Sequence, residues 1–516
     1  MPVPLAVVSI DAGTTAVKVI VLGLEGSQLG AARSSVTVCR PDGERAEQDM
    51  DQLWHAVADT VKQALQRAGT CNVIAVSVTG QGDGMWLVDD AGRPTGPAAC
   101  WLDGHAADVV HEWSGDGRAQ LVTEVTGSAL FPGALPVLLE RLRRDDPGRL
   151  ARSWYHLNCK DWIRLRLTAQ IGTDLSDASR TYLDPRTGRY SDRLLDGLGH
   201  RSLARLLPPV LPAADVAGTV TPAAQQATDL PVGVPVITGV MDTAAAALGL
   251  GAVSPGDAYA IVGTTSFMGV ITSARDDSHI QASSFVPTGV NGLVIASHSP
   301  MTGAPNFDWA CQVTAPEVGS TEQPEWSAIE TQAAAAGPGA SGVLYLPYLA
   351  DSGERAPFVD PAASAAWLGL SVRNIRGHLL RAVYEGLALT ARECLEQLRV
   401  TERITVCGGA AASDLLCQVL ADVTGVGVAR SRAEEVGARG VAALAVATVQ
   451  GESLAAVVAR FRGAVQCFLP DPAASAIHDR QSVVFAAVRD ALRPAWPGLR
   501  SLRTDPSARQ PRPPGE

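Results

Sequence analysis

The sequence predicts an α/β protein built from two related domains, and three observations carry this prediction. Residues 7–24, VVSIDAGTTAVKVIVLGL, place Asp-Ala-Gly-Thr-Thr between two runs of β-branched residues. Residues 258–272, AYAIVGTTSFMGVIT, repeat a Gly-Thr-Thr between apolar runs in the second half of the chain. Strand and helix patterns alternate throughout, which favours helices layered on sheets. A length of 516 residues gives room for two or more domains.

The first Gly-Thr-Thr unit joins two predicted strands that are apolar on both faces. Residues 7–10 form one strand and residues 17–22 the next, which suits a central sheet covered on both sides. The turn at residues 13–15 presents N–H groups and two hydroxyls, and a bare glycine lets an anion approach closely. A P-loop is excluded, because G-x-x-x-x-G-K-[ST] must open a helix and a strand follows here. A plain β-hairpin is the alternative.

The remaining elements follow from local periodicity and turn residues. We expect a helix at 52–67, a strand at 72–80, an amphipathic helix ended by Pro147, short pieces at 185–200 and 207–235, a domain junction within 230–256, a long helix at 375–398 and a strand–glycine turn–helix unit at 404–425. Residues 496–516, and most clearly those from Ser501 onward, are rich in Pro, Arg and Ser without periodicity, which predicts a disordered tail.

Composition narrows the class of protein. A formal net charge of −11 argues against nucleic acid or an anionic membrane surface as the main partner. No stretch of about 20 apolar residues predicts a membrane span, and the N-terminus lacks the basic region of a signal peptide. The nine cysteines include no C-x-x-C pair, so we expect reduced, mostly buried thiols and a cytoplasmic location.

Asp242 is the strongest candidate for a catalytic group. It follows a strand and begins an Ala-rich helix, so it is either an N-cap or a general base at a cleft whose charge the helix dipole would maintain. Asp11 precedes the first Gly-Thr-Thr turn and suits a Mg²⁺ site. Two carboxylates and two anion-binding turns match the needs of phosphoryl transfer.

Two glycine-rich turns are weaker candidates. The turn at Gly408 and Gly409 follows a strand, where a flat ring or a ribose can lie against the backbone, although glycine pairs more often only turn the chain. The loop from Gln81 to Gly84 carries Asp83 between two glycines, as a binding loop would. From this piece alone, an ordinary turn is the preferred interpretation.

These pieces, taken in order, resemble the FGGY family of carbohydrate kinases, within the actin–sugar kinase–Hsp70 ATPase fold. The resemblance runs from about residue 5 to residue 495. It is carried by the motifs IDAGTTAVKVIVLG, LNCKDWIRLRLTAQIGTDLSDAS, GVMDTAAAALGLGAVSPGDAYAIVGTTS, GERAPFVDPAASAAWLGLS, VYEGLAL, VCGGAAASDLLCQVLADVTGVGV and EEVGARGVAALA.

The resemblance implies two ribonuclease-H-like domains, at residues 1–245 and 246–495, around a cleft for nucleotide and sugar. It implies ATP and Mg²⁺ as cofactors, with Asp242 as the base for the sugar hydroxyl and Asp11 and Asp242 near the metal. The implied cofactor-binding residues are Asp11, Gly13, Thr14, Thr15, Lys18, Gly263, Thr264, Thr265, Gly408, Gly409, Ala410 and Ser413, and the implied substrate contacts are Gln81, Gly82, Asp83, Trp101, Asp103 and Asp242.

Two positions depart from the family pattern. His105 stands where many members have Arg, which should change substrate contacts, and Ala169 replaces a glycine, which should affect only a turn. The motif GQGDG, together with GERAPFVDP and EEVGARG, resembles the erythritol kinase and L-xylulose kinase branch.

We therefore expect an ATP-dependent kinase that phosphorylates a hydroxyl of a small polyol or ketose. The alternatives are an Hsp70-like or actin-like switch ATPase and an inactive family member that only binds a polyol. The absence of a substantial C-terminal peptide-binding domain argues against the first, and the intact Asp11 and Asp242 argue against the second. A homodimer is a candidate assembly that the sequence does not decide.

Overall fold

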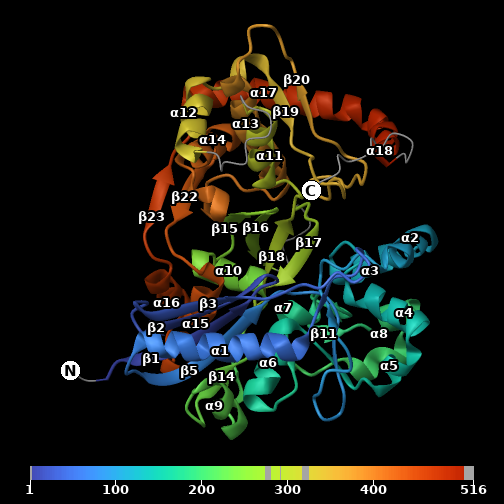
Figure 1. Ribbon diagram of the computed structural model, residues 1–516, viewed down its shortest axis with the longest axis vertical. Coiled ribbons are helices and arrows are strands. Elements are labelled where there is room, and N and C mark those ends of the chain that lie inside the picture. Colours follow the sequence, from blue (N-terminus) through green and yellow to red (C-terminus); the bar gives the residue numbers. More distant parts are fainter. Residues whose placement is uncertain (1–2, 274–279, 291, 316–324, 505–516) are drawn as a thin grey trace, which may run out of the picture.

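The computed structural model describes residues 3–273, 280–290, 292–315 and 325–504, and it places two mixed β-sheets one above the other (Figure 1). The first sheet has the strand order β13-β14-β5-β1-β2-β3. Its strands are β1 (Leu5–Ala12), β2 (Ala16–Gly23), β3 (Gln28–Ser35), β5 (Asn72–Gly80), β13 (Val216–Thr219) and β14 (Pro235–Ile237).

The second sheet has the strand order β17-β18-β16-β15-β21-β22-β23. Its strands are β15 (Ala258–Val262), β16 (Ser266–Ser273), β17 (Ser284–Pro287), β18 (Leu293–His298), β21 (Arg403–Cys407), β22 (Gly427–Ser431) and β23 (Val465–Phe468). Two-stranded sheets are formed by β4 (Glu47–Gln48) with β7 (Ala98–Ala99), β6 (Trp86–Val88) with β8 (Tyr155–Leu157), β9 (Thr173–Asp174) with β12 (Val210–Leu211), β10 (Leu183–Asp184) with β11 (Arg189–Tyr190), and β19 (Leu344–Leu346) with β20 (Ala366–Leu368).

The two sheets share one connection pattern. In the first, β1 pairs antiparallel with β2 and parallel with β5, and β14 is parallel to β5. In the second, β15 pairs antiparallel with β16 and parallel with β21, and β22 is parallel to β21. Each Gly-Thr-Thr turn thus joins the two equivalent central strands of its sheet. This confirms the prediction of two related α/β halves.

Helices α10 (Asp242–Leu250) and α15 (Val436–Gln450) lie between the sheets (Figure 1). They form one apolar core with the facing sides of both sheets. The two helices pack closely because the residues at their contact are small. A Cβ on Gly440, for example, would lie 2.7 Å from the backbone nitrogen of Gly249. The expected domain boundary after residue 245 falls within α10, so the division at 245 and 246 stays a prediction.

Further helices cover the outer faces of the sheets and extend each half. They are α1 (Met50–Ala68), α2 (Ala107–Asp116), α3 (Arg118–Thr126), α4 (Leu135–Asp145), α5 (Pro147–Arg152), α6 (Cys159–Thr168), α7 (Leu175–Ala178), α8 (Asp192–Gly197), α9 (Pro222–Thr228), α11 (Pro305–Val313), α12 (Trp326–Ala335), α13 (Arg376–Gln397), α14 (Asp414–Thr424), α16 (Leu454–Phe461), α17 (Pro472–Leu492) and α18 (Trp496–Thr504). As expected, α4 ends just before Pro147, which then begins α5, because proline fits the first turn of a helix but not its interior.

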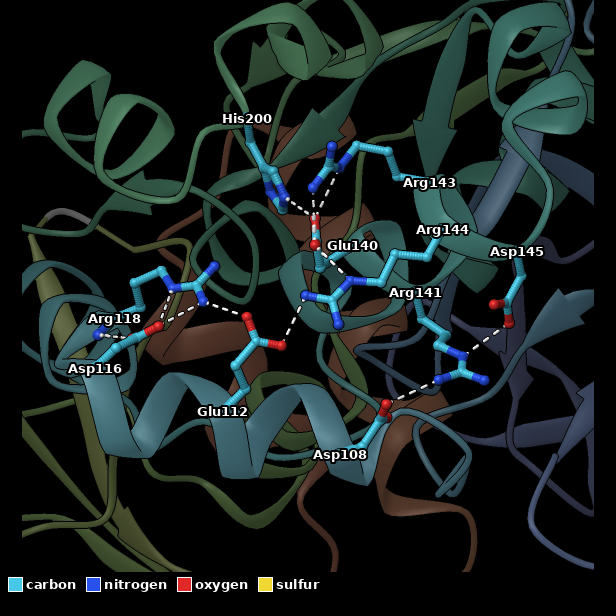
Figure 2. A network of polar contacts seen from close by, with 10 residues as sticks. All are labelled: Asp108, Glu112, Asp116, Arg118, Glu140, Arg141, Arg143, Arg144, Asp145 and His200. Atoms are coloured by element: carbon cyan, nitrogen blue, oxygen red, sulfur yellow. Dashed lines mark hydrogen bonds and ion pairs between the residues drawn. The ribbon is translucent and has the colours of Figure 1, made fainter.

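A polar network holds α2, α3 and α4 together at one side of the first half (Figure 2). The buried carboxylate of Glu140 accepts hydrogen bonds from Arg143, Arg144 and His200 at 2.7–3.1 Å. Arg144 also bonds Glu112 on α2, at 2.9 Å. Burial raises the pKa of Glu140, but these donors outweigh burial and lower it to about 2. The network therefore depends on an ionised Glu140.

The prediction of a disordered tail is wrong for residues 496–504, which form α18. Trp496 is 1% exposed and packs against Tyr348 and Phe358, with ring centroids 5.6 and 6.0 Å apart. One buried aromatic residue supplies the apolar area that the composition of the tail lacks. Residues 505–516 lie outside the described part of the chain.

The nine cysteines are free thiols, and six of them are buried, as expected. Within the described ranges, no helix is both long and apolar enough to cross a membrane.

Candidate active site

Asp11 lies at the end of β1, directly before the first Gly-Thr-Thr turn. The turn is closed by a 3.0 Å hydrogen bond from the N–H of Gly13 to the carbonyl of Ala16. Burial raises the pKa of Asp11 to about 6; the charge of Lys18 opposes this rise and that of Glu435 adds to it. Asp11 is thus a partly buried carboxylate one residue before the Gly-Thr-Thr turn.

Asp242 is the first residue of α10, and the N-cap position is held by Met241. The interpretation of Asp242 as an N-cap is therefore wrong, and its Oδ1 accepts the N–H of its own neighbour Thr243 at 2.6 Å. Burial raises the pKa of Asp242 to about 7, and the nearby charge of Asp11 raises it further. Burial and the second carboxylate therefore act against the helix dipole, which favours the ionised form.

A third acidic residue, Glu435, faces the same place from the second half. Its carboxylate lies 2.8 Å from the Nζ of Lys18 on β2. It precedes α15 in a left-handed conformation with φ 53°. One residue into that helix, a Cβ on Gly437 would lie 3.3 Å from the Oδ2 of Asp11. The N-terminal turn of α15 therefore adjoins Asp11, which the sequence signalled only by an acidic pair before a helix of small residues.

Lys160, at the beginning of α6, is a completely buried cation among acidic groups. Its Nζ lies 2.6 Å from Asp161, 2.9 Å from Asp174 and 3.1 Å from Asp177. These residues come from the beginning of α6 and from β9 and α7. A charge so far from water is stable only when it is paired, so this cluster fixes the position of α7 against α6.

The Lys160 cluster connects to the catalytic candidate through one hydroxyl. The Oγ of Ser176 donates to Asp174 at 2.6 Å and accepts the N–H of Met241 at 2.8 Å. Met241 directly precedes Asp242, so the start of α10 is held by the buried cluster. The motif LNCKDWIRLRLTAQIGTDLSDAS contributes to the family resemblance, but its sequence alone predicts no role for Ser176.

The second Gly-Thr-Thr turn is braced by a loop that sequence reasoning missed. The N–H of Ala304 donates to the carbonyl of Gly263 at 2.7 Å, and a Cβ on Gly303 would lie 2.5 Å from that same carbonyl oxygen. The buried Glu354 holds this loop by accepting the N–H of Met301 at 2.7 Å and the hydroxyl of Thr302 at 3.2 Å. Thr264, the middle residue of the turn, is exposed.

The predicted nucleotide end lies where β21 leaves the second sheet. Gly408 has φ 98°, and a Cβ there would lie 2.5 Å from the carbonyl of Val262, so only glycine fits. Gly409 is exposed, with nothing within 4 Å of its Cβ position, and Ala410 is half-buried. Ser413 caps α14 by accepting the N–H of Leu416 at 3.0 Å. Gly408 and Gly409 thus expose backbone without a side chain, whereas the hydroxyl of Ser413 is used to cap α14.

The loop from Gln81 to Gly84 is tied to the first Gly-Thr-Thr turn. The hydroxyl of Thr14 accepts the indole N–H of Trp101 at 2.9 Å and donates to Gln81 at 3.0 Å. Because the hydroxyl proton is already donated to Gln81, Thr14 can offer a phosphate only its backbone N–H. A Cβ on Gly82 would lie 2.7 Å from the Cγ of Met241, so the loop packs directly against the residue before Asp242.

Asp83 and Asp103 differ in what they can offer a substrate. Asp83 is ion-paired with Arg180 at 3.1 Å, and its side chain is still 16% exposed. Asp103 is buried, and its two oxygens accept the N–H of Ala46 at 2.9 Å and both the N–H and the ring of His105. His105 thus caps Asp103 rather than facing the cleft as a free group, and a direct sugar contact by Asp103 is not supported.

Ala169, the other departure from the family pattern, ends α6 with φ 57° and marks only a turn.

The chain matches the model of the N-terminal domain of the FGGY family of carbohydrate kinases over residues 6–249, and that of the C-terminal domain over residues 258–449. It belongs to the FGGY family of carbohydrate kinases. It is 31% identical to an erythritol kinase of Brucella abortus (strain 2308) over 513 residues, covering 96% of this chain and 98% of that one. It is 28% identical to the L-xylulose/3-keto-L-gulonate kinase of Escherichia coli (strain K12) over 487 residues, covering 92% and 94%.

Solved structures of the FGGY fold agree with this arrangement. The xylulose kinase of Rhodospirillum rubrum superposes with a TM-score of 0.85 at 26% identity, covering 95% of this chain and 99% of that one. The gluconate kinase of Lactobacillus acidophilus superposes with a TM-score of 0.88 at 21% identity, covering 96% and 100%. The chain is therefore an FGGY kinase in fold and in class of activity.

The residues present fit the metal and nucleotide that FGGY kinases use. No three His, Cys, Asp or Glu side chains in the described ranges are grouped to hold a metal ion. Mg²⁺ at phosphate-transfer sites needs only one or two carboxylates, since waters and phosphate oxygens supply its other ligands. Asp11 and Asp242 are two such carboxylates, and Gly408 and Gly409 carry no side chain that would exclude a nucleoside.

Proposed function

We propose that this kinase transfers the γ-phosphoryl group of Mg·ATP to one hydroxyl of a small neutral polyol or ketose. The observation that carries the proposal is the pair of partly buried carboxylates Asp242 and Asp11, near enough that the charge of Asp11 raises the pKa of Asp242, with a Gly-Thr-Thr turn in each half. One named relative is an erythritol kinase and another is an L-xylulose/3-keto-L-gulonate kinase, and the polyol and the ketose in these names support the class of a small polyol or ketose.

Asp242 would act as the general base. Its carboxylate would accept the proton of the attacking hydroxyl while the hydroxyl oxygen forms a bond to phosphorus and the bond to ADP breaks. The products are a sugar phosphate, ADP and one proton, so the reaction needs no other reactant. A base whose pKa is raised to about 7 accepts a proton more readily than an ordinary Asp does at neutral pH.

The other groups would bind and align the reactants. Asp11 and Asp242 would hold Mg²⁺, which neutralises phosphate charge when bound. The turns at residues 13–15 and 263–265 would contact the phosphates through backbone N–H groups. The loop from Gln81 to Gly84, together with Trp101, would contact the sugar.

The charge balance at the sugar end favours a neutral substrate. Asp83 is neutralised by Arg180, so the loop presents a paired carboxylate rather than a free charge. Such a group can accept hydrogen bonds from sugar hydroxyls without demanding a cationic partner. A homodimer and a cytoplasmic location stay predictions.

The test is coupled ADP release against a panel of acceptors: erythritol, threitol, glycerol, D- and L-xylulose, D- and L-ribulose, ribitol and xylitol. We expect turnover with one polyol or ketose, and a loss of about 10²- to 10⁴-fold in kcat for Asp242→Asn. Binding of ATP, measured by calorimetry, should survive this change. The matched control is Asp229→Asn, which alters an exposed residue at the end of α9.

Turnover of none of these acceptors, with ATP hydrolysis that no sugar stimulates, would contradict the proposal and favour the switch ATPase. Acceptor binding without turnover would favour the inactive member.

A further inference from the structure

Arg180 joins its own segment to three others where the two halves of the chain meet. Its Nε lies 3.1 Å from the Asp83 carboxylate, on the loop after β5. Its Nη1 donates to the hydroxyl of Ser128, after α3, at 2.8 Å and to that of Ser284, the first residue of β17, at 2.7 Å. Ser284 belongs to the second half of the chain, while the other three residues belong to the first. One guanidinium therefore contacts both halves.

The backbone around Arg180 makes a second crossing between the halves, away from α10 and α15. The N–H of Ala129 donates to the carbonyl of Ser283 at 3.2 Å. A Cβ on Gly127 would lie 3.2 Å from the ring of Phe285, so the loop at residues 127–129 rests directly on β17. The two seryl hydroxyls at this crossing, of Ser128 and Ser284, lie 3.0 Å apart. Arg180 donates to both, and so it reinforces the crossing.

Asp83 is held in an orientation that its loop does not readily leave. It has φ 58°, in the left-handed region that favours glycine and that Asp adopts more readily than most other residues. The following Gly84, with φ 82°, packs against the carbonyl of Ala99. Within this fixed loop, the Asp83 side chain has one ionic partner, Arg180, and keeps 16% of its surface exposed. The carboxylate is therefore fixed on one side and available on the other.

A second arginine from the opposite half lies within range of this pair. Arg355 is partly buried, and its Nε donates to the carbonyl of Ser299 at 2.8 Å. Burial lowers its pKa, and the charges of Asp83 and Arg180 act on it in opposite directions. Asp83 is thus bonded to Arg180 of its own half, and its charge also acts on Arg355 of the other half.

We propose that Arg180 is a positioning and specificity residue. It bridges Asp83 to Ser284 across the cleft, so that the Asp83 carboxylate is presented to acceptor hydroxyls only when the halves meet. This inference rests on the sugar-kinase function proposed above. It assigns to Arg180 a role in acceptor binding and not in phosphate binding. It also makes Ser284 the contact that reports closure.

The test compares Arg180→Gln, Arg180→Lys and Ser284→Ala with the full-length protein. KM is measured separately for ATP and for the acceptors of the panel above, including erythritol and L-xylulose. Backbone amide hydrogen exchange is measured on the free proteins at residues 127–129 and in β17. Arg193→Gln is the matched control, because it removes an ion pair with Glu124 on the surface of the same half.

We expect Arg180→Gln to raise the acceptor KM about 10- to 100-fold, since hydrogen bonds to a charged group are lost, while the ATP KM changes less than twofold. Exchange at Ala129 should become faster, because the crossing loses two of its hydrogen bonds. Arg180→Lys should recover part of the affinity, and Ser284→Ala should speed exchange with a smaller change in acceptor KM. In a double-mutant cycle, Asp83→Asn should add little to Arg180→Gln.

An unchanged acceptor KM in Arg180→Gln, or equal rises in the KM for ATP and for the acceptor, would overturn the inference. The exchange measurement separates it from the proposed function. If the wild-type protein phosphorylates no acceptor of the panel, the proposed function is wrong. Independently of that result, the bridge is overturned if amide exchange at Ala129 is the same in Arg180→Gln as in Arg193→Gln.

Discussion

The ammonium group of Lys18 lies 2.8 Å from the carboxylate of Glu435, and this ion pair joins β2 of the first sheet to the start of α15. Burial raises the pKa of Asp11, and the positive charge of Lys18 opposes that rise. One cation is thus shared by two carboxylates that are 424 residues apart in the sequence. The balance of charge beside the proposed metal site depends on this pair.

Substitutions of the two partners of this ion pair should shift the Mg²⁺ concentration for half-maximal activity in opposite directions. Glu435→Gln leaves Lys18 to pair with Asp11 alone, which should raise the Mg²⁺ concentration for half-maximal activity about fivefold, or ~1 kcal/mol. Lys18→Met removes a positive charge and should lower that concentration while raising the KM for ATP. Magnesium titrations of both variants check this, with Lys62→Met on α1 as control. Shifts in the same direction would mean that the pair is only structural.

Ser176→Ala should slow catalysis without weakening nucleotide binding. The change leaves the N–H of Met241 without its acceptor, which costs about 1–3 kcal/mol and loosens the residue next to Asp242. We expect a fall of about tenfold in kcat from the displaced base, with an unchanged KM for ATP. Ser179→Ala, in the same short segment, removes a hydroxyl that donates only to the carbonyl of Ser176. Equal losses in both variants would contradict a specific role for Ser176.

Gly303→Ala should damage the second phosphate turn. The new Cβ would lie 2.5 Å from the carbonyl oxygen of Gly263, and a backbone atom cannot yield as a flexible side chain can. We expect the KM for ATP to rise about tenfold and the melting temperature to fall, as overpacking costs about 1–3 kcal/mol. Gly115→Ala in α2 has open space around its Cβ and should leave both quantities unchanged. Steady-state kinetics measure the KM for ATP and thermal unfolding measures the melting temperature. Values for Gly303→Ala that match those for Gly115→Ala would contradict the prediction.

Glu140 should make the stability of the first half sensitive to acid. Its pKa falls from 4.5 to about 2 on folding, so its contribution is complete above pH 4.5 and is lost as the pH falls toward 2. Glu140→Gln should lower the free energy of unfolding at pH 7 by about 2 kcal/mol and should flatten the fall below pH 4.5. Urea unfolding at pH 7, 4.5 and 3 tests this, with the surface change Glu124→Gln as control. Parallel pH profiles for the wild-type protein and Glu140→Gln would refute it.

Local patterns were enough to predict the central elements. The strand at 72–80 agrees with β5, the helix at 375–398 with α13, and the Gly-Thr-Thr turns with the two equivalent hairpins. These predictions succeed because alternation, helical spacing and turn glycines are properties of neighbouring residues. The prediction of a disordered tail failed because α18 depends on Trp496 packing against a distant core.

The sequence by itself determined the two-fold repeat, the α/β class and the candidates Asp11 and Asp242. Only the tertiary structure decided their electrostatics and their supports: Glu435 beside Lys18, the Lys160 cluster behind Met241, the capping of Asp103 by His105, and the bridge from Arg180 to Ser284. Spacing along the chain sets which residues share an element. Contacts between segments hundreds of residues apart, and the burial that shifts a pKa, arise only when the two sheets enclose α10 and α15.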